Sequence, residues 1–208
     1  MDKRVFFILI VLSLSIGYFA GYFVGKKSAL NNKKVERVVD NGSSGNASNP
    51  HSSGMMAENK SVDMERIHSE IKELKQRVEK NPGDFESLKS LGDIYYDIKD
   101  FKNAVSYYEM ALKVKKSLPV MVDLSTCYVN LNKVDKAISI LNEVLKEKPD
   151  FPQALYNMGI IYLHGKNDFK MAKKYWQKLY DIGAPGFDRD RLKMMLDALD
   201  KSIKEGAK

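Results

Sequence analysis

Cysteine and histidine are scarce in this sequence, and catalytic motifs are missing. The single cysteine excludes a disulfide framework, a paired-cysteine redox site and a covalent haem attachment motif. The three histidines, His51, His68 and His164, lie far apart and have no metal-ligand spacing. The sequence contains no GxxxxGKS/T phosphate loop, no GxGxxG dinucleotide motif and no HExxH zinc motif. We therefore expect no catalytic residues, no cofactor and no metal site, which predicts that the protein is not an enzyme.

A concentrated charge of one sign is also missing. Lysine and arginine number 34 against 27 aspartates and glutamates, which gives a net charge of +7. The basic residues are dispersed among acids and do not form the stripe that nucleic-acid binding requires, so we expect no nucleic-acid partner. Hydrophobic residues make up 44% of the chain, close to the globular norm. Their uneven distribution divides the chain into three parts.

The first part, residues 1–27, is predicted to be a membrane anchor with short basic flanks. Residues 5–24 read VFFILIVLSLSIGYFAGYFV and contain no charged side chain. A helix of about 20 such residues spans the hydrocarbon core of a bilayer. A cleaved signal peptide is the alternative, but Tyr18 stands where a small residue should precede the cleavage site. We favour an uncleaved, single-pass anchor.

Small residues recur at every fourth position of this predicted membrane helix. They are Ser13, Gly17, Gly21 and Gly25. Small side chains on one face allow two helix backbones to approach closely. This face is predicted to associate with another membrane helix, either a second copy or a partner's helix, although glycine is also common in membrane helices without such a role.

Basic residues lie on both sides of the predicted anchor, so its orientation is not decided by the sequence. Counting all nearby lysines and arginines places the carboxyl-terminal side in the cytoplasm. A short basic tail directly before an anchor, here Lys3 and Arg4, commonly stays inside instead.

The second part, residues 28–63, is predicted to be a disordered linker. It includes NGSSGNASNPHSSG at residues 41–54, a composition typical of flexible tethers. Such a segment buries too little apolar surface to offset the loss of chain entropy on folding. The linker would let a globular head search the space near the membrane.

The third part, residues 64–208, follows a helical period and contains an internal repeat. We predict a helix over 64–80, three repeats over about 85–117, 118–151 and 152–185, and a terminal helix over 188–204. Each repeat has a small residue, an aromatic residue and an alanine at equivalent positions: Gly92, Tyr95 and Ala104; Ser125, Tyr128 and Ala137; Gly159, Tyr162 and Ala172.

This pattern is that of the tetratricopeptide repeat (TPR). The small residues let the first helix of a repeat (helix A) lie close to the second (helix B), and the aromatic residue fills the gap between them. The prediction is an all-α TPR solenoid of three helix-turn-helix repeats, closed by the flanking helices. The third repeat has one extra residue, which we expect in a longer loop at residues 165–168.

Helix A of each repeat is predicted to line a concave, partner-binding groove. Its inward-facing residues are Glu86, Lys89, Asp93, Tyr96 and Asp97 in the first repeat, Val122, Thr126, Val129 and Asn130 in the second, and Gln153, Tyr156, Ile160, Leu163 and His164 in the third. They change from acidic to apolar along the stack. Apolar and aromatic residues without a core to fill indicate a surface for a partner peptide or helix. The alternative is that helix 188–204 folds back over them.

One known binding mode of TPR domains is excluded. TPR domains of chaperone cofactors grip a peptide carboxylate with lysine and asparagine on helix A. Here Asp93 and Asp123 stand where asparagine is expected, and two acids would repel a carboxylate.

Two segments, residues 74–112 and 168–199, carry a resemblance to one bacterial family. The second contains AKKYWQKLYDIGAPGFDRDRL, in which Trp176-Gln177-Lys178-Leu179 is the most specific part. With the anchor, the linker and the repeats, they resemble the membrane-anchored TPR subunits of cytochrome c haem lyase. The resemblance implies an inner-membrane protein with a periplasmic head, a chaperone that binds the carboxyl-terminal helix of an apocytochrome c during cytochrome c biogenesis. The alternative is a structural scaffold or assembly subunit of another cell-envelope complex.

Overall fold

The computed structural model describes residues 53–206, with side chains from Met64 to Glu205. The predicted membrane helix with Ser13, Gly17, Gly21 and Gly25, and most of the predicted linker, lie outside the described residues. Within residues 53–206, no helix has the length and apolar character needed to cross a membrane.

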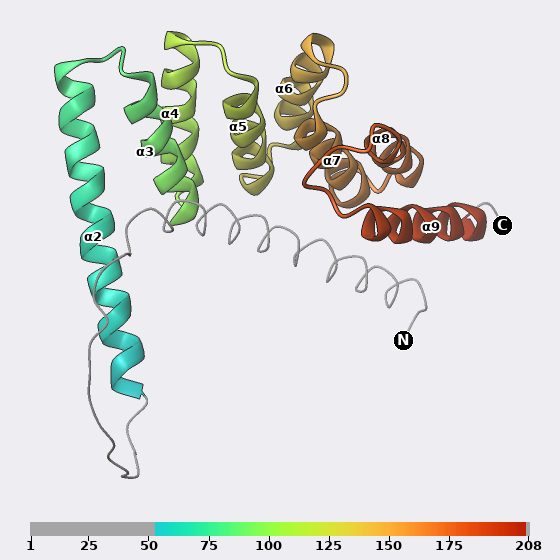
Figure 1. Cartoon of the computed structure of the whole chain (residues 1–208), viewed down its shortest axis with the longest axis horizontal. Coiled ribbons are helices and arrows are strands. Elements are labelled where there is room, and N and C mark those ends of the chain that lie inside the picture. The colour runs from blue at the N-terminus through green and yellow to red at the C-terminus, as the bar shows by residue number, and fades with distance from the viewer. Residues whose placement is uncertain (1–52, 207–208) are drawn as a thin grey trace, which may run out of the picture. The chain divides into compact units, whose positions relative to one another are not determined.

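Eight α-helices and one π-helical turn account for the regular structure of residues 53–206, which contain no strand. They are α2 (Ser53–Lys80), α3 (Phe85–Asp97), α4 (Phe101–Val114), α5 (Leu118–Asn130), α6 (Val134–Glu147), α7 (Pro152–Ile160), η1 (Ile161–Gly165), α8 (Phe169–Asp181) and α9 (Arg189–Gly206). Helices α3 and α4, α5 and α6, and α7 and α8 pack as hairpins, and each hairpin packs on the next through α4 with α5 and α6 with α7 (Figure 1). This part of the chain is an all-helical solenoid, as the repeat pattern predicts.

The interface between helix A and helix B depends on the absence of a side chain in helix A. A Cβ atom at Gly92 would lie 2.5 Å from the ring of Tyr108, and one at Gly159 would lie closer still to the indole of Trp176. Ser125 takes the same place in the second repeat and is fully buried, with its hydroxyl donating to the Val122 carbonyl (2.6 Å). The predicted close approach of the paired helices is confirmed.

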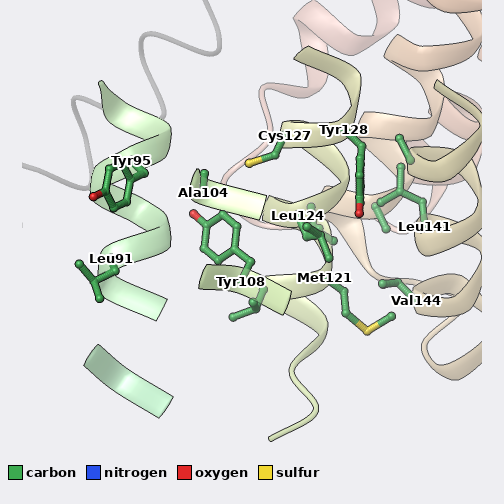
Figure 2. Close-up of a cluster of buried hydrophobic side chains, with 14 of the residues drawn as sticks. Leu91, Tyr95, Ala104, Tyr108, Met121, Leu124, Cys127, Tyr128, Leu141 and Val144 are labelled. Carbon is green, nitrogen blue, oxygen red and sulfur yellow. The ribbon is translucent and has the colours of Figure 1, made fainter. Parts of the chain in front are cut away.

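The core is continuous from one repeat to the next. Figure 2 shows buried side chains that extend from Leu91 and Tyr95 through Tyr108 and Leu124 to Leu141. Because each helix pair buries its apolar face against its neighbours, the repeats stabilise one another, as expected for a solenoid.

The extra residue of the third repeat does not lengthen the loop, so that prediction is wrong. In the first two repeats, the N–H groups of Asp100 and Lys133 donate to carbonyls five residues earlier, those of Tyr95 and Tyr128. In the third, the N–H of Asp168 donates to the carbonyl of Tyr162, six residues earlier. The turn keeps three residues in every repeat, and the extra residue lies in the π turn η1. A π turn holds one more residue per hydrogen-bonded ring than an α-helix.

The conserved geometry of these turns explains why the helix absorbs the insertion. The middle residue of each turn has a left-handed backbone: φ is 64° at Lys99, 58° at Asn132 and 54° at Asn167. In the first and third turns the last residue also caps helix B, since the carboxylates of Asp100 and Asp168 accept backbone N–H bonds from the helix's first turn (3.2 and 2.9 Å). An added loop residue would break both features.

The first helix is longer than predicted. Helix α2 begins at Ser53, so residues 53–63, which we predicted to belong to the linker, are helical. The Asn/Ser/Gly-rich composition ends at Gly54, and good helix formers such as methionine, alanine and glutamate follow it. The second half of α2 packs on the repeats, with Ile71 and Leu74 buried in the shared core; Figure 1 shows its first half extending beyond α3 and α4.

Candidate partner-binding face

The predicted groove residues belong to α3, α5, α7 and η1, the first helices of the three repeats. We call their side chains, together with Asp123 and Asn157, the helix A face. One hydrogen bond and one electrostatic influence link neighbouring repeats across it. The Asn157 amide of α7 donates to the Thr126 hydroxyl of α5 (3.2 Å), and the Asp123 carboxylate of α5 raises the pKa of Lys89 on α3.

Most predicted residues of this face are accessible. Glu86, Asp97, Asn130 and His164 are exposed, and Lys89, Asp93, Tyr96, Thr126, Val129, Gln153 and Ile160 are half-buried. Val122, Tyr156 and Leu163 are buried, with exposed fractions of 5%, 6% and 7%. These three have the register of partner-facing residues but contribute mainly to the core.

Tyr156 is covered by side chains of the protein itself. Its ring lies between the rings of Trp176 (6.2 Å) and Phe187 (5.6 Å). Phe187 belongs to the segment between α8 and α9, so it is this segment that covers Tyr156. Helix α9 packs mainly on α8.

The end of the face formed by α3 is acidic. The Lys89 ammonium is paired with Asp93 (2.5 Å), which also accepts a hydrogen bond from the Tyr108 hydroxyl (2.8 Å). Burial lowers the pKa of Lys89, but the hydrogen bond to Asp93 and the charges of Asp93, Asp123 and Glu86 outweigh it, so the pKa is raised. One ammonium group therefore lies among three carboxylates.

An aromatic ring lies within this acidic end. Burial is the main cause that raises the pKa of Tyr96, and the charges of Asp123 and Asp97 raise it further. Its ring meets that of Phe101 edge to face at 5.6 Å. Tyr96 is thus a neutral, half-buried phenol with carboxylates on both α3 and α5 near it.

Cys127 is buried behind the acidic end, and its thiol is unreactive. It is fully buried, and burial together with the charges of Asp123 and Asp93 raises its pKa to about 12. A thiol in this state is not a nucleophile at neutral pH. Among residues 64–205, no group of three or more histidine, cysteine, aspartate or glutamate side chains is arranged to hold a metal ion.

Apart from Asp123, whose charge acts on Lys89 and Tyr96 of α3, the middle of the face is polar and uncharged. The Thr126 hydroxyl donates to the Val122 carbonyl (3.1 Å) and accepts from Asn157, while the Asn130 amide donates to the Thr126 carbonyl (2.8 Å). The predicted list of inward-facing residues did not include Asn157 or Asp123, although Asp123 was recognised at a position that grips a carboxylate in other TPR domains. Both occupy the same repeat position, one residue after Tyr156 and Val122, which is the signal that could have identified them.

The end formed by α7 and η1 has no charged side chain, and its accessible residues are Ile160, His164 and the polar Gln153 and Asn157. Ile160 is half-buried where the π turn begins, and Leu163 and His164 lie within that turn. Burial of the His164 ring lowers its pKa below the usual value, so the imidazole is uncharged at neutral pH. The helix A face therefore changes from acidic around α3 and Asp123 to uncharged at α7 and η1.

Comparisons with known proteins agree with this architecture. The family model "Tetratricopeptide repeat protein 21 forth ARM domain" matches residues 88–180. The mitochondrial import receptor subunit TOM70 of Saccharomyces cerevisiae is 30% identical over 69 residues, 33% of this chain and 11% of that protein. The formate-dependent nitrite reductase complex bifunctional subunit NrfFG of Haemophilus influenzae is 27% identical over 157 residues, 70% of this chain and 40% of that protein. The chain thus spans less than half the length of these curated relatives.

Solved structures share the fold. A tetratricopeptide repeat protein from Parabacteroides merdae superposes with a TM-score of 0.59 at 21% identity, covering 73% of this chain and 59% of that one. The first TPR of Spaghetti (RPAP3), bound to the HSP90 peptide SRMEEVD, gives a TM-score of 0.51 at 16% identity, covering 58% and 93%. With the three helix pairs between Phe85 and Asp181, these likenesses show that this part of the chain has the fold of TPR domains.

Proposed function

We propose that this protein is a membrane-tethered binding module that holds a peptide or helix of a partner protein on its helix A face. The observation that carries the proposal is the accessibility of that face. Three stacked helices bury one side in the core and leave polar, aromatic and apolar residues of the other side half-exposed, among them Tyr96, Val129 and Ile160. A TPR domain of the same fold is bound to a peptide, which supports this use of the fold.

The tether in this proposal is the uncharged segment at residues 5–24. A segment of that length and composition suits a single crossing of the bilayer. We place the protein in the inner membrane with its repeats in the periplasm. Protease digestion of intact spheroplasts tests this: an outward head is degraded without lysis, and protection until lysis would place it in the cytoplasm.

For the pathway, we propose cytochrome c maturation, with the carboxyl-terminal helix of an apocytochrome c as the bound segment. The partial likeness to the NrfFG subunit of a formate-dependent nitrite reductase complex supports this choice. So does the resemblance of residues 168–199 to TPR subunits of haem lyase.

A photo-cross-linking amino acid at Ile160 tests the binding face directly. Ile160 suits this better than Tyr156, because Tyr156 is part of the core. In cells that express cytochromes c, the label at Ile160 should capture an apocytochrome c. The same label at Glu143, an exposed residue of helix B in the second repeat, is the control and should not. Equal capture at both positions, or at neither, would contradict the proposal.

A second candidate is a structural scaffold of a cell-envelope complex. It is favoured by large apolar residues exposed outside the helix A face, Val114 (43%), Ile182 (38%) and Met194 (56%), and by the small-residue face of the predicted anchor. Replacing Gly17 and Gly21 with isoleucine separates the two functions. If the protein is a scaffold, this variant should lose its complex although peptide binding stays intact. If the protein is a binding module, the variant should still capture its partner at Ile160.

A further inference from the structure

The charge of the helix A face changes in one direction along the stack. Four carboxylates, those of Glu86, Asp93, Asp97 and Asp123, accompany the single ammonium of Lys89 at the α3 end. The helix A face on α7 and η1 has no aspartate, glutamate, lysine or arginine, and His164 there is uncharged. A bound segment would meet a negative potential at one end and uncharged side chains, with Ile160 as the accessible apolar one, at the other.

The acidic end contains both chemical elements that recognise a cationic side chain. The half-buried ring of Tyr96 supplies a π system, and Asp97 and Asp123 are close enough to influence its hydroxyl group. Aromatic rings attract lysine and arginine through their quadrupole, and carboxylates attract them by charge, more strongly with arginine when two hydrogen bonds form. Two adjacent helices contribute to this set, α3 with Tyr96 and Asp97 and α5 with Asp123.

We propose that the segment bound by this protein is basic at one end and apolar at the other. Its lysine or arginine lies against Tyr96 between Asp97 and Asp123, and its apolar residues lie over Val129 and Ile160. This inference rests on the proposed function and adds the chemistry and direction of the partner segment.

The helix spacing sets the length of the segment. Helices in direct packing lie about 10 Å apart, so the path from α3 over α5 to α7 covers at least about 20 Å. A helical ligand needs about 14 residues for that distance. The partner is therefore about four helical turns, with its charged and apolar ends separated along its length.

Charge also explains what this face should reject. The peptide SRMEEVD that the Spaghetti TPR domain holds has three acidic side chains. Brought to the α3 end, they would face Asp93, Asp97 and Asp123, and like charges brought together on binding cost affinity.

Three synthetic helical peptides of 14 residues test the inference on the full chain in a zwitterionic detergent. They share one apolar end and carry lysine and arginine, glutamine, or glutamate at the other. Fluorescence anisotropy at low salt should show the basic peptide binding at least about tenfold more tightly than the acidic one. The difference should shrink in 0.5 M salt because mobile ions screen exposed charges. SRMEEVD should bind no better than the acidic peptide.

Matched charge reversals locate the effect. Asp97→Lys and Glu86→Lys each place a cation on the acidic end and should weaken the basic peptide about tenfold, while relieving the penalty on the acidic one. Both residues are exposed, and a lysine at position 97 suits the carboxyl end of α3, so the fold should be kept; circular dichroism checks this. Glu143→Lys makes the same change on helix B of the second repeat and should leave all three affinities within about twofold.

The outcomes separate this inference from the function it builds on. Equal binding of the basic and acidic peptides, or no effect of Asp97→Lys, would overturn the basic-end inference. If Ile160→Asp still weakened those peptides, the face would stand as a binding site. If none of the three peptides bound while the label at Ile160 still captured an apocytochrome c, the basic-end inference would fail and the proposed function would stand.

Discussion

The first and third repeats have the same interior and different outer surfaces. In both, a glycine of helix A lies against a large ring of helix B, Gly92 against Tyr108 and Gly159 against Trp176. In both, two tyrosines stack at the same repeat positions: Tyr95 with Tyr107 at 5.4 Å and Tyr162 with Tyr175 at 5.6 Å.

The helix A faces of the first and third repeats, in contrast, have different residues at equivalent positions. Asp93 and Asp97 occupy the positions that Ile160 and His164 occupy in the third repeat, and only the third contains a π turn. The interior is constrained because each ring needs a gap of one size, whereas the accessible residues of the helix A face are not held by that packing. The comparison therefore separates the residues that determine the fold from those that are free to differ between repeats.

Truncating Trp176, the larger of the two rings that face a glycine, should have the largest effect on stability and should remove the similarity between the two interiors. Trp176 is fully buried, and its indole N–H donates to the Tyr156 carbonyl (3.0 Å). Trp176→Ala should lower the free energy of unfolding by about 4 kcal/mol, since it leaves a cavity and an unmatched carbonyl. Urea denaturation measures this loss. Met194→Ala, at an exposed site of α9, should change stability by less than about 0.5 kcal/mol. Similar effects for both would mean that Trp176 is not a core residue.

Filling the gap should have the next largest effect and should depend on the ring opposite. Gly159→Ala places a Cβ against the Trp176 indole and should destabilise by about 2 kcal/mol through overpacking, despite the better helix propensity of alanine. In the Trp176→Ala background the same change should be neutral or stabilising, because the opposing ring is absent. A double-mutant cycle measures this coupling, and strictly additive effects would contradict the close-contact explanation.

The pH dependence sharpens the contrast between the buried thiol and the exposed acids near it. The raised pKa of Cys127 means that the neutral thiol is favoured in the folded state, so its contribution is complete below pH 9 and is lost as pH rises from about 9 to 12. Between pH 8 and 10 the wild-type protein should lose about 1 kcal/mol more stability than Cys127→Ala. Parallel loss in both proteins would show that the thiol does not differ between the two states.

Removing the insertion should have the smallest effect on stability. Deletion of His164 restores the spacing of the first two repeats, so η1 should become α-helical with a change of less than about 1 kcal/mol. Thermal unfolding measures the change, and NMR hydrogen-bond couplings report the helix type. Deletion of Lys166, which lies in the turn, is the control and should cost more, because the turn geometry is shared by all three repeats. An equal cost for both deletions would argue against a π turn that simply absorbs one residue.

The sequence was sufficient for the repeat architecture and insufficient for details that depend on neighbouring elements. The spacing of Gly92, Ser125 and Gly159 predicted helix pairing, because a small residue that recurs at one position of each repeat indicates that a second helix packs closely against it. The number of residues in the third repeat showed that one was extra but did not show where. The helix took it because the turn makes more specific hydrogen bonds than the end of helix A does.

The sequence predicted which residues lie on the helix A face, but it predicted less well which of them are accessible. Thirty-odd-residue spacing assigned Tyr156 and Ile160 to the same face, yet Tyr156 is buried because Phe187, thirty-one residues later, packs on it. Asp123 was missed as a face residue because its importance comes from its closeness to Lys89 and Tyr96 on another repeat.

By itself, the sequence determined that this chain forms paired helices, which residues join each pair, and that the helix A face changes from acidic to uncharged along the stack. These features depend on residues a few positions apart, where helix geometry is the same in every repeat. Only the tertiary structure decided where the extra residue lies, which face residues stay accessible and which carboxylates gather around Lys89. Those features depend on contacts between segments about thirty residues apart, whose distance in space is set by packing.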